Sequence, residues 1–137
     1  MSQIRSIRNN SGFTLVELMM AMLIAVIGMF GVLETINVTL QHNLKNELRS
    51  EAIKVGERYM TELRGKRFDR LSTAYSSFAA TSKVRGGSKS YTVERTTAPL
   101  AYDDLGEPTS KQLQVVVKWA YKNISSQNRV VSVVARP

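Results

Sequence analysis

The sequence predicts an α+β protein in which one long N-terminal helix packs on a small antiparallel β-sheet. Residues 13–33 form an apolar run whose single charged side chain is Glu17. Apolar residues then recur every three or four positions as far as Leu63, which is the spacing of a helix that is apolar on one face. The C-terminal third instead alternates apolar and polar residues, which is typical of half-buried strands. At 137 residues the chain has room for one folded domain.

The apolar run FTLVELMMAMLIAVIGMFGVL has the length of a transmembrane helix, because a helix needs about 20 residues to cross a bilayer core. A cleaved secretory signal is the alternative, but its apolar region would be shorter and followed by a small-residue cleavage site. Arg5 and Arg8 precede the run, and the first basic residue after it is Lys45. The positive-inside rule therefore predicts a cytoplasmic N-terminus, with the bulk of the chain on the other side.

Glu17 is the informative residue of this segment. A carboxylate inside an apolar membrane helix costs about 2.5–3.5 kcal/mol and usually has a partner. Nothing basic lies within helical reach of Glu17 inside the apolar run. Either Glu17 reaches the interface at the positive end of the helix dipole, or its partner belongs to another chain.

The residues SGFTLVEL, numbered 11–18, follow a short basic leader and open the apolar run. This arrangement resembles the class III signal of type IV prepilins. The resemblance implies that prepilin peptidase cleaves between Gly12 and Phe13 and that the new amino group of Phe13 is N-methylated. It also implies that Glu17 pairs with the N-terminal amine of a neighbouring subunit and so sets the axial register of a filament.

The same resemblance implies three regions and a location for each. Residues 1–12 are expected to be the leader, 13–38 the transmembrane and filament-core helix, and 39–137 a periplasmic or extracellular head. The subunit would first cross the inner membrane once, with its head in the periplasm, and then enter a pilus filament on the cell surface. Its expected partners are prepilin peptidase, the inner membrane before assembly, and other pilin subunits through the N-terminal helix.

Within the pilin-like proteins the chain is most similar to the PilV group of minor pilins, from residues 27–31 (IGMFG) and from a C-terminal strand rich in Val with Trp119. Major pilins usually have a proline part-way along the membrane helix, and that position falls at Glu34. The missing proline, the absence of a cysteine pair and the basic charge favour a minor pilin that supports pilus assembly, adhesion or motility. A GspI-like pseudopilin of type II secretion shares the leader, the glutamate and the scaffold, and it stays open as the alternative.

Beyond the membrane run, the helical pattern continues without proline or a turn cluster. Its apolar positions are Leu40, Leu44, Leu48, Ala52, Val55, Tyr59 and Leu63. One helix from Phe13 to about Leu63 would be roughly 75 Å long at about 1.5 Å per residue. A separate second helix or a coiled-coil stalk is the alternative, and Gly56 weakens the helix slightly.

Three strands are predicted in the rest of the chain: 90–95, 112–121 and 129–135. The second places Leu113, Val115, Val117, Trp119 and Tyr121 on one face, and the third does the same for Val131, Val133 and Ala135. Residues 122–128 have the composition of a turn, so the last two strands should form a hairpin packed on the helix. Residues 64–89 and 98–110 contain most of the remaining Gly and Pro and are predicted to be loops.

Composition argues against an enzyme, because the chain has no cysteine and only one histidine, His42. With these residues we expect neither a Ser/His/Asp or Cys/His catalytic set nor a histidine-rich or thiolate metal site. No catalytic residue, metal or cofactor is therefore expected. The adjacent Asp103 and Asp104 are interpreted as turn residues, with a weak calcium site as the alternative.

The formal net charge of +8 suits an anionic membrane, an acidic partner or nucleic acid. Nucleic-acid binding, as in pilins that capture DNA, is the rival hypothesis from another class. The residues that would carry it are Lys83, Arg85, Lys89, Arg95, Lys118, Lys122 and Arg129. A solvated basic surface is the interpretation preferred here.

Overall fold

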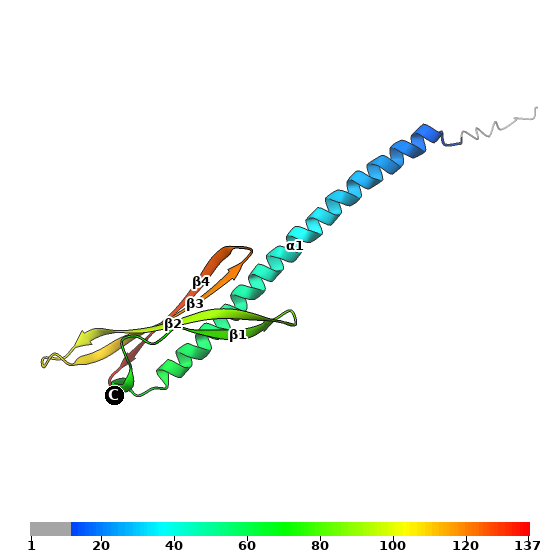
Figure 1. The fold of residues 1–137 in the computed structure, drawn as a ribbon. Helices are drawn as coiled ribbons and strands as arrows, with labels where there is room; N and C mark the ends of the chain where they lie inside the picture. The colour runs from blue at the N-terminus through cyan, green and yellow to red at the C-terminus, as the bar shows by residue number, and fades with distance from the viewer. Residues whose placement is uncertain (1–11) are drawn as a thin grey trace, which may run out of the picture. The chain divides into compact units, whose positions relative to one another are not determined.

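The computed structural model describes residues 12–137, which form one long helix, one short 3-10 turn and four strands (Figure 1). Their bounds are α1 Leu15–Arg64, η1 Phe68–Arg70, β1 Phe78–Val84, β2 Gly87–Tyr102, β3 Pro108–Tyr121 and β4 Ile124–Ala135. The predicted α+β fold, a long helix packed on a small antiparallel sheet, is confirmed.

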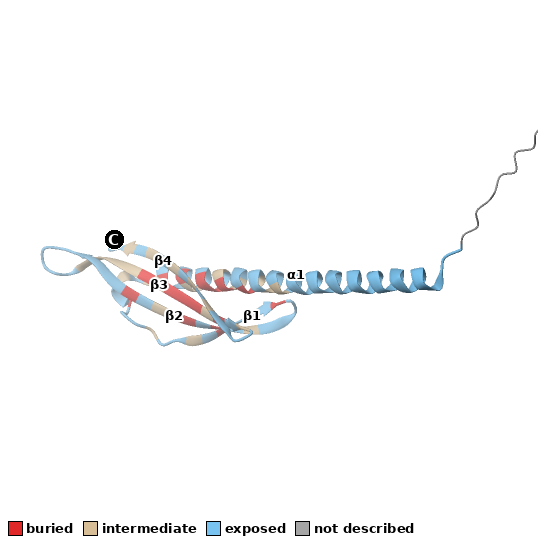
Figure 2. Ribbon diagram, turned by 90° about the horizontal axis from the view of Figure 1, so that it is seen from above, coloured by how far each residue is buried: buried red, intermediate tan, exposed pale blue. Residues whose placement is uncertain are grey.

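The chain divides into two compact units, Met1–Gln41 and His42–Pro137, the first of which is described from Gly12 onward. The described part of the first unit is residues 12–14 and the apolar part of α1, residues 15–41, whose side chains are exposed as far as Leu40 (Figure 2). The second unit contains the rest of α1 and the whole sheet, and it is called the head below. Buried residues, drawn red in Figure 2, occur in the head alone among the described residues.

Helix α1 is continuous over 50 residues because no proline or turn cluster interrupts it. Thr14 caps its start, and at its end the Gly65 N–H donates to the Thr61 carbonyl at 3.0 Å. Arg64 lies in the last turn, where a positive charge favours the negative end of the helix dipole. A single helix is therefore confirmed, and the alternative of a separate second helix was wrong. The alternative of a coiled-coil stalk was also wrong, because Leu48, Ala52 and Val55 pack into the core with the sheet.

The four strands pair in chain order, β1-β2-β3-β4, and every neighbouring pair is antiparallel. Two of the connections are tight. Arg85 and Gly86 have φ of 47° and 78°, and Lys122 and Asn123 have φ of 47° and 63°. Positive φ at both central residues is the signature of a two-residue type I′ hairpin, whose twist matches that of the strands.

Several predicted boundaries were wrong. The region 64–89, predicted to be a loop, contains η1, β1 and the start of β2, and most of 98–110 belongs to β2 and β3. The predicted turn 122–128 is only two residues long. β1 is an edge strand whose inward positions alternate but include the small or polar residues Ala80 and Ser82, so its apolar pattern in the sequence is weak. The end of β2 and the start of β3 contain no buried residue, so backbone pairing holds them without an apolar alternation.

The helix-facing side of the sheet carries the core. Its largest fully buried side chains are Tyr91, Val93, Leu113, Val115 and Val117, together with Leu63 of α1. The predicted inward face of β3 is thus confirmed. On β4 the inward apolar residues are Val130 and Val134, whereas Val131 and Val133 are 46% and 56% exposed. The register explains this, because Val130 lies opposite buried Val115 and Val131 lies opposite Gln114.

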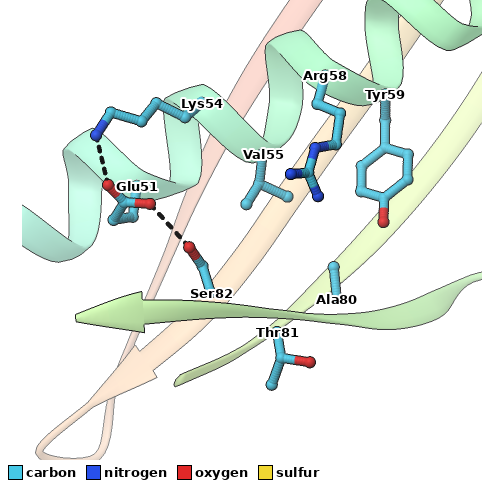
Figure 3. Close-up of a pocket in the computed structure, with 8 residues that line it drawn as sticks. All are labelled: Glu51, Lys54, Val55, Arg58, Tyr59, Ala80, Thr81 and Ser82. Atoms are coloured by element: carbon cyan, nitrogen blue, oxygen red, sulfur yellow. Dashed lines mark hydrogen bonds and ion pairs between the residues drawn. The ribbon is translucent and has the colours of Figure 1, made fainter. Parts of the chain in front are cut away.

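Polar contacts fix the helix against the sheet edge, as Figure 3 shows. The two carboxylate oxygens of Glu51 accept from Ser82 Oγ of β1 at 2.8 Å and from Lys54 Nζ at 2.6 Å. These hydrogen bonds hold the pKa of Glu51 below its ordinary value, and the bond from Lys54 has the larger effect. Beside them a groove of about 200 Å³ opens between α1 and β1. Deeper in the core, the Tyr91 hydroxyl donates to the Leu48 carbonyl at 3.3 Å.

Candidate functional site

The bond predicted to be cleaved lies in an accessible segment. Gly12 and Phe13 precede the first residue of α1 and are both exposed, Phe13 to 83%. No neighbouring atom lies within 4 Å of the position that a Cβ atom would take at Gly12. Proteases bind their substrates in extended form, so a peptide bond ahead of the helix is suitably presented.

The first turn of α1 is built around Thr14 and Glu17. The Glu17 N–H donates to Thr14 Oγ1 at 3.2 Å, which makes Thr14 the N-cap and Glu17 the third residue of the helix. The spacing Thr-x-x-Glu is that of a capping box, in which the glutamate carboxylate bonds back to the N-cap N–H. That second bond is not made among residues 12–137. The Thr14 cap was missed at the sequence level, although the capping-box spacing would have identified it.

The Glu17 carboxylate thus has neither a hydrogen bond nor an ion pair within the part of the chain that the structure describes. It belongs to the first turn, where the exposed N–H groups and the helix dipole favour negative charge. Within residues 12–137 the exposed Glu17 side chain therefore has no partner of its own. Glu34, at the far end of the apolar run, also has no ion-pair partner among these residues.

The apolar part of α1 presents hydrocarbon all round. Every large apolar residue from Leu15 to Leu40 is at least half exposed, and the segment is long and apolar enough to cross a membrane. Its threonines are satisfied within the helix, since Thr35 and Thr39 donate to carbonyl oxygens one turn earlier at 2.9 Å. Such self-satisfied hydroxyls allow a segment to enter lipid without losing hydrogen bonds.

These features coincide with a known signal. Residues 7–33 match the family described as the prokaryotic N-terminal methylation motif. The match includes Gly12, Phe13 and Glu17, and it supports a type IV pilin or pseudopilin in general. It ends inside the apolar helix, so the head lies outside it. No curated protein and no solved structure matches the chain.

Of the seven basic residues predicted for nucleic-acid binding, four have no ion pair within residues 12–137. Three of the seven form ion pairs: Arg85 with Glu47 at 2.9 Å, Arg95 with Glu62 at 3.2 Å, and Lys118 with Glu94 at 2.6 Å. The Arg95 guanidinium also lies over the Phe78 ring at 4.8 Å, which gives it a packing role. Three of the residues predicted to bind nucleic acid therefore have a structural contact inside the head instead.

Asp103 acts in a turn, as predicted. Its Oδ1 accepts from the backbone N–H groups of Leu105 and Glu107 at 3.0 and 2.8 Å, within the β2–β3 connection. Gly106 follows with φ of 79°, a conformation that glycine adopts readily. Among residues 12–137 no group of three or more His, Asp or Glu side chains is placed to hold a metal ion.

Proposed function

We propose that this chain is a minor pilin of a type IV pilus. Prepilin peptidase removes residues 1–12, Phe13 is N-methylated, and the subunit waits as a single-pass inner-membrane protein with its head in the periplasm. It then enters the filament through residues 13–38 and serves pilus assembly, adhesion or motility. The observation that carries the proposal is the exposed Gly12–Phe13 bond ahead of a capped apolar helix whose Glu17 carboxylate has no partner among the described residues.

The proposed processing would create a partner for Glu17, which has none among the described residues. Water hydrolyses the Gly12–Phe13 peptide bond, leaving a carboxylate on Gly12 and a free amine on Phe13. That amine is protonated at neutral pH and must release this proton before it reacts. Its lone pair then attacks the methyl group of a methyl donor, whose demethylated form leaves, and the product is a secondary ammonium that is still cationic. The subunit therefore acquires a positive charge four residues before its negative one.

The magnitudes favour pairing between subunits. Opposite charges about 4 Å apart attract by about 4 kcal/mol at an effective dielectric constant of about 20. That exceeds the roughly 2.5–3.5 kcal/mol cost of an unpaired glutamate in an apolar helix. Pairing across subunits would thus favour the filament over lipid and would fix the axial offset between neighbouring helices.

A GspI-like pseudopilin is the second candidate, since the methylation motif supports either class. The minor-pilin assignment draws on the absence of proline between residues 13 and 38 and of any cysteine. The two are separated by deleting the gene and measuring surface pili and secreted proteins. Loss of pili with normal secretion supports a minor pilin, and the reverse result supports a pseudopilin.

The mature N-terminus tests the proposal directly. We expect mass spectrometry of the native protein to find a first residue of N-methylated Phe13. A native protein that retains residues 1–12 would have no amine for Glu17 to pair with, and the proposal would fail. This measurement does not depend on which machine the filament serves. A filament subunit needs no catalytic residue, metal or cofactor, and the proposal assigns it no enzymatic activity.

A further inference from the structure

A polar groove in the head opens between α1 and the β3–β4 hairpin. Its volume is about 390 Å³, within the range of small-ligand sites. One wall is formed by three basic side chains of α1, His42, Lys45 and Arg49, which lie on one face of the helix at spacings of three and four residues. The other wall includes Trp119 of β3 and the side-chain amides of Gln127 and Asn128 of β4.

The groove is cationic because nothing in it neutralises Lys45 or Arg49. No carboxylate lines the groove, and neither residue forms an ion pair within residues 12–137. Elsewhere in the head, Lys54, Arg85, Arg95 and Lys118 are each paired with a glutamate. Glu47, the acidic residue nearest to Lys45 in the chain, is held by Arg85 at 2.9 Å.

The wall opposite the cations suits an ionised phosphate. Phosphate oxygens only accept hydrogen bonds, and the amides of Gln127 and Asn128 can donate to them. Lys45 and Arg49 supply positive charge one helical turn apart, and Arg can bind phosphate through two parallel N–H groups. The groove lacks a carboxylate that could receive an ammonium group, so it favours a headgroup with negative charge alone over a zwitterionic one.

The position of the groove in the chain selects the source of the phosphate. His42 follows the proposed membrane-crossing segment 13–38 by only four residues. At about 1.5 Å per residue, Lys45 and Arg49 follow residue 38 by at most about 10 and 16 Å of chain in α1, so chain connectivity keeps them within reach of the bilayer surface, where lipid phosphates border the hydrocarbon core. We propose that the groove binds the phosphate of an anionic phospholipid headgroup while the subunit is in the membrane. This rests on the membrane crossing of the proposed function.

The chain supplies its own reporter for a test. Trp119 is the sole tryptophan and lines the groove, so its emission reports on occupancy. The full chain, purified in a neutral detergent, is titrated with dihexanoyl phosphatidylglycerol, dihexanoyl phosphatidylcholine and inorganic phosphate. We expect a saturable change with phosphatidylglycerol at a concentration at least tenfold lower than with either other probe. Inorganic phosphate that binds as tightly would overturn the lipid assignment.

Matched variants locate the site. Lys45→Gln combined with Arg49→Gln should weaken phosphatidylglycerol binding at least tenfold. Lys83→Gln combined with Arg70→Gln removes the same charge from two exposed residues outside the groove and should leave binding unchanged. Equal loss in both double variants would mean unspecific attraction and would contradict the site. The single variants Lys45→Gln and Arg49→Gln, each checked by circular dichroism, provide the test if a double variant does not fold.

An acidic segment of another subunit is the competing occupant. A peptide with the sequence of residues 103–107, DDLGE, tests it in the same titration. A peptide that binds more tightly than phosphatidylglycerol would overturn the lipid proposal. Because every titration is done in detergent, a negative result would leave the cleavage at Gly12 untouched, and the two proposals fail separately.

Discussion

Gly56 of α1 lies directly against Val130 of β4. A Cβ atom at residue 56 would be 3.0 Å from Val130 Cγ2 and 3.4 Å from Val117 Cγ2, and the first distance is shorter than nine in ten real Cβ contacts. Glycine is a poor helix former, yet here it allows the helix and the sheet to approach closely. The residue that weakens the helix in the sequence therefore has a packing role in the fold.

Gly56→Leu is expected to lower the free energy of unfolding by about 1–3 kcal/mol, because the added side chain overpacks the contact with Val130. Urea unfolding of the full chain in detergent, followed by Trp119 emission, measures the effect. Val130→Ala should relieve part of it, so the double variant should be more stable than the sum of the two single effects by at least about 0.5 kcal/mol. Strictly additive effects would mean that the two residues do not compete for space.

Glu51→Gln is expected to cost about 0.5–1 kcal/mol at pH 7, mainly through the charge-assisted hydrogen bond to Ser82, since the pair with exposed Lys54 is screened by solvent. The pKa of Glu51 is lowered from its ordinary value of 4.5 by the hydrogen bonds from Lys54 and Ser82. Its stabilisation is thus present above pH 4.5 and is lost as the pH falls through the lowered pKa. The urea midpoints of wild type and variant should converge on acidification.

Glu57→Gln is the matched control for that experiment. Glu57 is an exposed carboxylate on the same helix, and its side chain has no ion pair within the described residues. Its replacement should leave the pH profile parallel to that of wild type. A constant difference between wild type and Glu51→Gln from pH 7 to pH 3 would exclude the proposed role of the carboxylate charge.

Tyr91→Phe is expected to cost about 0.5–1.5 kcal/mol at pH 7 through the lost bond to the Leu48 carbonyl. Burial is the main cause that raises the pKa of the Tyr91 hydroxyl above its ordinary value of 10.0. The folded state therefore retains the phenol proton more tightly, and this stabilisation disappears as the pH rises above 10 through the raised pKa. Above pH 10 the difference between wild type and variant should shrink. Tyr102→Phe, at a residue that is 59% exposed, should show no such change.

The long helix and the inward face of β3 could be predicted because burial leaves a periodic trace in the sequence. Leu48, Ala52, Val55 and Leu63 keep the helical period, and Leu113 to Trp119 keep the period of two. The face of β4 could not be assigned in this way. Its valines at 130 and 131 are adjacent, as are those at 133 and 134, so each pair offers one residue to either face. The register set by the Lys122–Asn123 turn decides between them.

The N-terminal signal could be recognised because its residues are neighbours in the sequence and keep a fixed spacing. The groove formed by Lys45 and Arg49 could not be assembled in the same way, because it depends on the β3–β4 hairpin returning beside α1. The spacing of Lys45 and Arg49 along the helix can be seen in the sequence. The opposite wall of the groove, formed by residues of β3 and β4, cannot. The pairing of Arg85, Arg95 and Lys118 was hidden for the same reason, as each partner glutamate lies at least 24 residues away.

Gly12→Val is expected to block processing, so that the subunit accumulates in the membrane with residues 1–12 attached. A β-branched side chain would occupy the open position beside the bond that we propose is cleaved, where glycine presents no Cβ. The mass of the N-terminal peptide measures the outcome. Ser11→Ala, one residue earlier, is the control and should be cleaved normally. Normal cleavage of Gly12→Val would count against the peptidase assignment.

Glu17→Ala is expected to be cleaved and methylated normally but to enter filaments at least tenfold less than wild type. Removal of the carboxylate would leave the proposed methylated amine of a neighbouring subunit without its counter-charge. A tenfold loss of incorporation corresponds to about 1.4 kcal/mol, which is less than the attraction of about 4 kcal/mol between the two charges. The variant should remain in the membrane at wild-type levels, because it no longer pays the cost of burying a charge. Immunoblots of sheared filaments and of membranes give the two quantities separately.

Glu34→Ala is the matched control, since it removes the same charge from an exposed position near the other end of the apolar run. Residue 34 is far along the helix from the amine of Phe13, so the Glu34→Ala variant should enter filaments as well as wild type does. Glu17→Gln keeps the shape of the side chain and should behave like Glu17→Ala if the charge matters. Wild-type incorporation of Glu17→Gln, with Glu17→Ala impaired, would assign the role to packing or hydrogen bonding and remove the ion pair from the mechanism.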